Sequence, residues 1–216
     1  MNTTLVLAGI LGALAVGVVS PGPSFILIVR TAVARSRADG LAAAAGMGVG
    51  GVAFGALALL GMHALLTHLA WLYMLLKIAG GLYLLYLAWR LWQGAGRPLQ
   101  AAGIEAGAEA ADATPWRSFL LGLTTQLSNP KTAVVYGSIF AALLPAHPST
   151  ALYVALPPLI FLIETGWYAL VALGFSSERP RAAYLRGKAW MDRLAGGLMG
   201  LLGLKLIYHA LPEQAP

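Results

Sequence analysis

Six apolar stretches dominate the 216-residue chain, and each could cross the hydrocarbon core of a membrane, which takes about 20 helical residues. They cover residues 4–33, 40–64, 70–92, 117–144, 150–175 and 194–211. The chain is 59% hydrophobic and only 10% charged, whereas soluble domains average about 25% charged residues. A soluble globule of this size could not bury so much apolar surface. The sequence therefore predicts an all-α integral membrane protein with six transmembrane helices.

Composition excludes several other classes of protein. The chain has no cysteine, which excludes a disulfide-rich scaffold, and its hydrophobicity excludes disorder. The net charge of +6 is not gathered into one run or interleaved with aromatic residues. Nucleic acid is therefore not a predicted partner, whereas the lipid bilayer is. The first apolar stretch follows no basic segment and is too long for a signal peptide, so we expect it to remain as a span.

The distribution of Lys and Arg predicts the orientation of the chain. Positive residues flank the loops after the first and third stretches and before the sixth: Arg30, Arg35, Arg37, Arg90, Arg97, Arg117, Arg179, Arg181, Arg186, Lys188 and Arg193. The loops around 63–69 and 145–149 carry none. By the positive-inside rule the basic loops are cytoplasmic, and both termini are periplasmic.

Two segments outside the spans have distinct compositions. Residues 94–115 are rich in Ala, Gly and Glu and predict a flexible cytoplasmic linker. Residues 177–193 mix basic residues with aromatic and aliphatic ones. Two interpretations remain for the second segment: a short helix on the inner leaflet, or a solvated loop.

The sequence contains an internal repeat. Lys77-Ile-Ala-Gly-Gly-Leu in the third stretch matches Arg193-Leu-Ala-Gly-Gly-Leu in the sixth. Ser20-Pro-Gly-Pro-Ser in the first stretch has a counterpart, Ser128-Asn-Pro-Lys-Thr, in the fourth. We therefore predict a single transmembrane transporter domain, with repeat one at 1–93 and repeat two at 116–211. Because each repeat has three spans, the second is inverted relative to the first, which is a recurring design of transporters.

Prolines are predicted to break the first and fourth spans. A proline inside a helix lacks the N–H group and clashes with the carbonyl group four residues earlier. Pro21, Pro23 and Pro130 therefore free carbonyl groups in the preceding turn, including that of Gly17. Such backbone is tolerated within a membrane only where it faces protein or water. Each break also begins a new helix, for which Asn129 is a good N-cap.

The two new helix N-termini suggest a binding site. Their free N–H groups and positive dipole ends suit a carboxylate, and the inverted repeats bring them to the middle of the membrane from opposite sides. The predicted substrate-binding residues at the breaks are Pro21, Gly22, Pro23, Ser24, Asn129, Pro130, Lys131 and Thr132. Three roles remain for the ammonium group of Lys131: to bind a substrate carboxylate, to pair with an acidic residue, or to reach the membrane interface.

Glu164 is the acidic residue in the middle of the fifth stretch. A carboxylate at this depth costs about 2.5–3.5 kcal/mol, so we expect it to face the bundle interior and to have a partner or a proton. It is predicted to bind a substrate ammonium group and to couple transport to protons. The alternative is a structural role, as a protonated donor to a freed carbonyl group. Opposite it, the second span carries glycines that allow close packing or leave room for a substrate: Gly46, Gly50, Gly51 and Gly55.

These motifs resemble those of the lysine exporter superfamily, in particular its threonine/homoserine exporter branch. The resemblance covers essentially the whole chain and rests mainly on Ser20-Pro-Gly-Pro-Ser24, the glycine-rich second span and Asn129-Pro-Lys131. It implies a bacterial inner-membrane exporter of amino acids or close derivatives, driven by the proton gradient, with no cofactor and no bound metal. A homo-oligomer is compatible with it. Family members often have Asp where this chain has Glu164, and many have Asp or Asn where it has Ser24.

Three other functions are compatible with parts of the sequence. An exporter of metal or organic cations would use Glu164 and freed carbonyl groups as ligands, and without Cys or intramembrane His only hard cations fit. An intramembrane enzyme would need Ser24 and Lys131 as a dyad, with no intramembrane His to help. A purely structural subunit would leave a buried charge and paired helix breaks without a purpose. We therefore expect a transporter and not an enzyme.

Overall fold

The structure, a computed structural model, consists of helices and short connections in the part of the chain that it describes, and no strand occurs there. The described residues are 2–20, 22–68, 70–95, 114–145, 147–175 and 178–210. The helices are α1 (Thr3–Val19), α2 (Pro23–Ala34), α3 (Arg37–His68), α4 (Ala70–Gly94), α5 (Pro115–Leu127), α6 (Pro130–Leu143), α7 (Thr150–Phe175) and α8 (Glu178–Tyr208). Residues 96–113 of the predicted linker lie outside the described residues.

The first and fourth predicted spans are each divided into two helices. The first consists of α1 and α2, which meet at an angle of 58°, and the fourth consists of α5 and α6. Pro23 and Pro130 occupy the first positions of α2 and α6, where a proline loses no hydrogen bond. The breaks therefore lie where the prolines predict them.

The described helices include clear candidates for membrane spans. By length and composition, Arg37–Gly61 of α3 and the whole of α7 could each cross a membrane, and α1 with α2 pass the same test as a bent pair. Large apolar side chains on the outer faces of these helices are exposed, among them Leu57 and Leu162. Exposed apolar surface of this kind suits contact with lipid rather than water.

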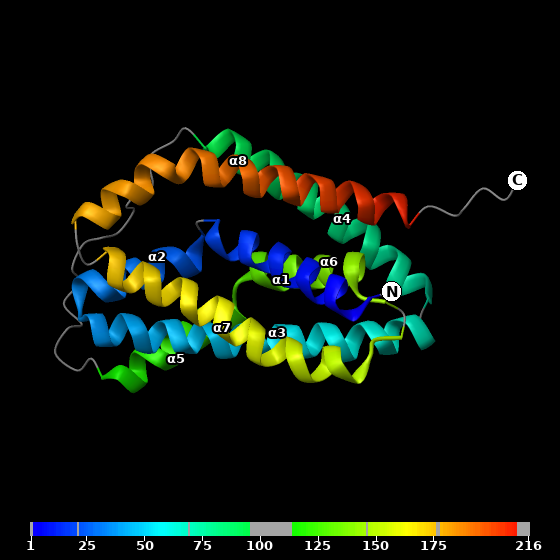
Figure 1. The fold of residues 1–216 in the computed structure, drawn as a ribbon, viewed down its shortest axis with the longest axis horizontal. Coiled ribbons are helices and arrows are strands. Elements are labelled where there is room, and N and C mark those ends of the chain that lie inside the picture. The colour runs from blue at the N-terminus through cyan, green and yellow to red at the C-terminus, as the bar shows by residue number, and fades with distance from the viewer. Residues whose placement is uncertain are drawn as a thin grey trace, which may run out of the picture.

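Figure 1 shows how the helices are arranged. α1 and α2 run from right to left in this view, whereas α5 and α6 run from left to right. α4 and α8 pack along each other on one side of the bundle, and α3 packs against α5 and α7 on the other. The N-terminus and the end of α8 both lie at the right-hand end. The broken helices α1, α2 and α6 thus lie between two layers of longer helices.

Two sequence predictions about helix ends are wrong. Residues 178–193 are neither a solvated loop nor a separate short helix, because they form the first half of α8. Packing of α8 along α4 stabilises this extension, together with an ion pair one helical turn apart within it. The predicted loop at 63–69 is almost entirely helical, since α3 continues to His68 and no proline or glycine interrupts 63–68.

Glycines bring α3 and α5 into backbone contact. A Cβ atom added at Gly46 would overlap the carbonyl oxygen of Phe119, and one at Gly122 would overlap that of Ala43. A Cβ atom at Gly51 would lie 2.8 Å from Cγ of Glu164. The glycines of the second span therefore serve close packing, and Gly51 makes space for the acidic side chain itself.

A polar contact joins the two halves of the chain at the end where the basic loops lie. Asp39, in the first turn of α3, accepts hydrogen bonds from the hydroxyls of Ser36 at 2.5 Å and Ser118 at 2.8 Å. The Ser36 hydroxyl in turn accepts from the backbone N–H of Asp39 at 3.0 Å, which completes a helix cap. Asp39 and Ser118 are both buried.

Replacing Asp39 by Ala is expected to destabilise the protein by about 1–3 kcal/mol, because buried Ser118 loses its acceptor and the cap loses one of its bonds. Thermal unfolding of the purified protein in detergent measures this loss. Arg37→Ala is the matched control, since Arg37 is exposed in the same turn. Equal melting temperatures for the Asp39 variant and the wild type would contradict the expected role of this contact.

Candidate functional site

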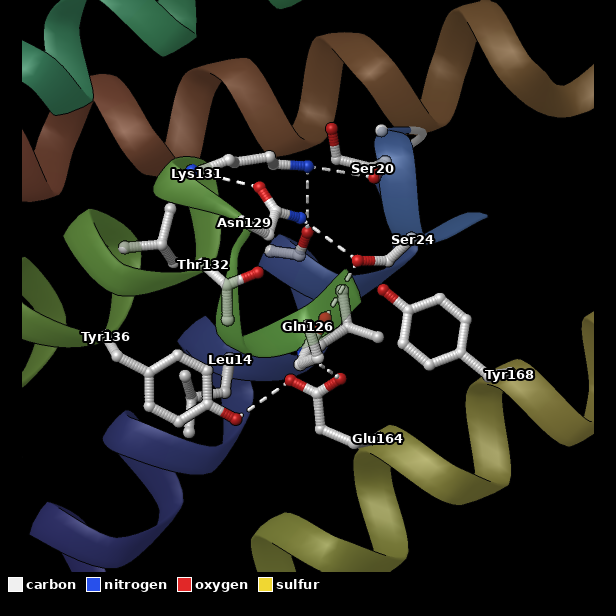
Figure 2. A pocket seen from close by; sticks show the side chains of 14 residues that line it. Leu14, Ser20, Ser24, Gln126, Asn129, Lys131, Thr132, Tyr136, Glu164 and Tyr168 are labelled. Atoms are coloured by element: carbon white, nitrogen blue, oxygen red, sulfur yellow. Dashed lines mark hydrogen bonds between the residues drawn. The ribbon is translucent and has the colours of Figure 1, made fainter. Parts of the chain in front are cut away.

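A chain of hydrogen bonds connects both helix breaks to the buried acid (Figure 2). The Ser24 hydroxyl, in the first turn of α2, donates to Oε1 of Gln126 at 2.8 Å and accepts from Nδ2 of Asn129 at 3.0 Å. Nε2 of Gln126 donates to Oε2 of Glu164 at 3.1 Å. The Tyr136 hydroxyl donates to the other carboxylate oxygen, Oε1, at 2.8 Å. Side chains from α2, α5, α6 and α7 therefore meet at one carboxylate.

The residues of this hydrogen-bond network are buried inside the bundle. Glu164 is 1% exposed, Gln126 is 1% exposed and Ser24 is 3% exposed. As expected, Glu164 faces the interior of the bundle. Both of its oxygens accept hydrogen bonds from uncharged donors, which is how a buried polar group avoids the cost of desolvation.

Lys131 holds the backbone of the first break. Its ammonium group donates to the carbonyl oxygen of Ser20 at 2.9 Å and to that of Gly17 at 3.4 Å. The Gly17 carbonyl group is one that Pro21, which has no N–H group, is predicted to free. Among the residues that the structure describes, no ion pair joins Lys131 to Glu164. A lysine at the second break therefore satisfies backbone carbonyl groups at the first break.

The two new helix starts are capped differently, as the sequence predicts. The Asn129 side chain accepts a hydrogen bond from the backbone N–H of Lys131 at 3.0 Å and caps α6. Gly22 precedes α2 and has no side chain to offer, so α2 begins without a side-chain cap. The N-terminus of α2 therefore keeps more free N–H groups than that of α6.

A pocket lies between the breaks, with about 380 Å³ of space between atoms including its open part. Six of the nine predicted site residues line it: Gly22, Ser24, Asn129, Lys131, Thr132 and Glu164. Pro23 and Pro130 begin helices and are not among the lining residues, and Pro21 lies outside the described residues. The structure thus brings together most of the predicted residues, at a small polar pocket.

Among the lining residues missed from the sequence, four have polar side chains: Ser20, Gln126, Tyr136 and Tyr168. Gln126 lies one turn before Pro130, so its position before the second break was a signal. A tyrosine hydroxyl within an apolar helix needs a polar partner, which could have drawn attention to Tyr136. Tyr168 follows Glu164 by one helical turn and so shares its face of α7.

Two of the alternative functions, a cation exporter and a Ser–Lys enzyme, would need particular groups of side chains to lie together. In the described ranges, no three His, Cys, Asp or Glu side chains lie together as metal ligands would. Ser24 donates its proton to Gln126, whereas the Lys131 ammonium group bonds to backbone carbonyl groups. Within these residues, neither a cluster of three such side chains nor a Ser–Lys dyad is assembled.

The fold and the site together define a multi-pass helical membrane protein with a buried polar pocket at two broken helices. The family model of the LysE type translocators matches residues 15–210, so the chain belongs to the LysE family. This is a family of transporters, and the resemblance seen in the sequence motifs is confirmed.

The most informative relatives are named for amino-acid efflux. The chain is 35% identical over 192 residues to the threonine efflux protein of Salmonella typhimurium, covering 89% of this chain and 92% of that one. It is 34% identical over 193 residues to the threonine efflux protein of Escherichia coli, with the same coverage. The leucine efflux protein of Enterobacter is 30% identical over 190 residues, covering 86% and 85%. No solved structure matches the chain.

Proposed function

We propose that this protein exports an amino acid from the cytoplasm in exchange for protons. One observation carries the proposal: a buried carboxylate, Glu164, is hydrogen-bonded through Gln126 and Ser24 to both helix breaks. A zwitterion needs an anionic and a cationic partner a few ångströms apart, and this pocket contains one of each in Glu164 and Lys131. The efflux proteins of threonine and leucine among its relatives agree with such a substrate.

The packing supports six spans arranged as two inverted repeats. Exchanging α1 with α5, α2 with α6, α3 with α7 and α4 with α8 maps several of the packed helix pairs onto other packed pairs. The pair α3–α5 maps onto α1–α7, α3–α6 onto α2–α7, and α1–α6 onto α2–α5. The opposite directions of α1–α2 and α5–α6 in Figure 1 agree with an inversion.

The same arrangement supports an orientation with both termini outside. The ends of α2, α4 and α7 and the start of α5 lie at the left of Figure 1, where the basic loops begin. Exposed tryptophans lie near this end: Trp89, Trp92, Trp116 and Trp190. Tryptophans gather at membrane–water interfaces, and Lys and Arg gather on the cytoplasmic side. The left-hand end is therefore cytoplasmic in the proposed orientation.

In the proposed mechanism, Lys131 and the N-terminus of α2 bind the carboxylate of the substrate. Glu164 binds its ammonium group and, in doing so, releases a proton to the cytoplasm. When the pocket opens to the outside and the substrate leaves, Glu164 takes up a proton from there. One proton thus enters for each zwitterion exported, and the positive charge that neutralises Glu164 alternates between ammonium and proton.

The observed hydrogen bonds fit a pocket without substrate. Glu164 is held by Gln126 and Tyr136, and Lys131 is held by the carbonyl groups of Ser20 and Gly17. A bound zwitterion would replace these partners with its own charged groups. Exchange of equivalent hydrogen bonds costs little, whereas leaving a buried group unpaired is expensive. This exchange ties substrate binding to rearrangement of both breaks.

Transport by the purified protein in liposomes tests the proposal. Vesicles are loaded with one of the twenty amino acids at a time, starting with threonine and leucine, and are diluted into acidic buffer. We expect at least one amino acid to leave faster than from protein-free vesicles, with acidification of the interior. Release of none of the twenty would overturn the exporter. Release that is unchanged when the pH gradient is collapsed would overturn only the proton coupling.

A further inference from the structure

A second buried carboxylate belongs to α8, the helix whose ribbon passes above the pocket in Figure 2, and it is not among the residues that line the pocket. Asp192 is 2% exposed, and its Oδ2 atom forms an ion pair with Nζ of Lys188 at 2.6 Å. Lys188 also donates to the carbonyl oxygen of Gly94, the last residue of α4, at 3.1 Å. Neither residue is used in the mechanism above. A buried ion pair is costly to form, so its presence in α8 needs an explanation.

One half of this carboxylate makes no hydrogen bond. Within the described part of the chain, Oδ1 of Asp192 is buried and has no hydrogen-bond partner, and the same is true of the Ser20 hydroxyl. Buried polar atoms of this kind are rare, and for a charged group the cost is high. A ligand that donates hydrogen bonds, such as an ammonium group, would satisfy an atom of this kind.

The position of α8 places Asp192 at the first helix break. Met199 lies against Gly17, with its Cε atom 3.5 Å from the position of an added Cβ. Asp192 precedes Met199 by about 10 Å along the axis of α8, at a rise of 1.5 Å per residue. Because α8 runs opposite to α1 and α2, this distance places Asp192 level with residues 20–24. In Figure 2 the ribbon of α8 passes above Ser20 and Lys131. The carboxylate is near enough to act electrostatically on the Lys131 ammonium group.

The predicted internal repeat indicates that a helix in the place of α8 can form without the Lys188–Asp192 ion pair. Aligning Arg193 with Lys77, as the repeated motif does, places Lys188 opposite Leu72 and Asp192 opposite Leu76. The other repeat therefore has apolar residues at both positions. The Lys188–Asp192 ion pair therefore has no counterpart in the other repeat. It lies toward the end of the bundle that carries the basic loops, where Lys188 contacts the last residue of α4.

We propose that Asp192 is a second substrate-binding carboxylate, which binds the ammonium group of the outgoing zwitterion on the cytoplasmic side of Lys131, before Glu164 does. This inference rests on the proposed function. Lys188 holds one oxygen of Asp192 in place and leaves the other to the ligand. Two carboxylates on either side of one lysine would let a zwitterion advance by exchanging one acidic partner for the next.

The double variant Lys188→Leu/Asp192→Leu, which copies the residues of repeat one, separates a binding role from a structural one. Replacing a buried ion pair by apolar residues is commonly neutral or stabilising, so the melting temperature should not fall. We expect the half-saturation concentration for export to rise about 10- to 100-fold, as the loss of a charge-assisted hydrogen bond implies. The probe is whichever amino acid the wild-type liposomes export fastest.

Arg193→Gln is the matched control, because Arg193 is a neighbouring charge on the exposed side of α8. Its half-saturation concentration should stay within about twofold of the wild type. If the double variant does not fold, Asp192→Asn replaces it, with the same expected rise. A wild-type half-saturation concentration in the folded variant, or an equal rise in the control, would overturn the inference.

The outcome is distinguishable from a failure of the proposed function. If the double variant behaves as the wild type while Glu164→Gln does not transport, the exporter stands and only the role of Asp192 is wrong. If the wild type releases none of the twenty amino acids, the proposed function fails and this inference fails with it.

Discussion

Replacing Glu164 by Gln is expected to abolish proton-coupled export, with at least a 100-fold loss of flux in liposomes under an imposed pH gradient. Gln has nearly the same shape, and its amide oxygen can still accept the hydrogen bond from Tyr136 while its amide nitrogen faces Gln126, so the fold should survive. It can neither neutralise a substrate ammonium group nor bind and release a proton. Losing one charged partner inside a dry site commonly costs several kcal/mol, which corresponds to a loss of this size.

The matched variant is Glu164→Asp, which keeps the charge and shortens the side chain by one methylene group. We expect it to retain measurable coupled flux, because the shorter carboxylate still faces the pocket. The melting temperatures of both variants in detergent check that they fold. Normal coupled flux in the folded Gln variant would remove Glu164 from the mechanism.

Replacing Gly122 by Ala is expected to destabilise the protein. The added methyl group would overlap the carbonyl oxygen of Ala43, and backbone on both sides of the contact leaves no flexible side chain to move aside. Overpacking of a tight core costs about 1–3 kcal/mol, and here α3 and α5 must separate along their whole contact. Thermal unfolding of the purified variant, together with its yield from the membrane, measures the effect.

Gly137→Ala is the matched control, since no other atom lies within 4 Å of its added Cβ. Alanine is the better helix former by roughly 0.5–1 kcal/mol in water, so this variant should be as stable as the wild type or slightly more so. If the Gly122 variant were as stable as the Gly137 variant, the close approach of α3 and α5 would not be important for the fold.

Much of the fold could be predicted from the sequence because the length and apolar composition of membrane helices identify them. The two breaks followed from Pro23 and Pro130, which occupy the same place at the start of a helix. The helix end at His68 and the start of α8 at Glu178 could not be located in this way. Hydropathy marks where lipid lies, and a helix that continues past the lipid changes its composition without changing its hydrogen bonding.

The site was predictable only in part. Residues at the breaks were found because proline has a local effect on backbone, and Glu164 because a lone acid within an apolar stretch is conspicuous. Gln126 and Tyr136 were missed because their importance comes from contacts across helices, which spacing alone does not reveal. Asp192 was missed because the sixth span was expected to begin two residues later, whereas the helix begins at Glu178.

The bond between the Lys131 ammonium group and the carbonyl groups of Ser20 and Gly17 has a consequence for selectivity. An amine that lacks a carboxylate has nothing to offer this lysine in return for those bonds. The kink in the first membrane helix would stay clamped, and such a molecule would block the pocket rather than pass through it. Decarboxylated amino acids should therefore act as inhibitors. The protein would select its substrate first by the carboxylate group and only then by the side chain.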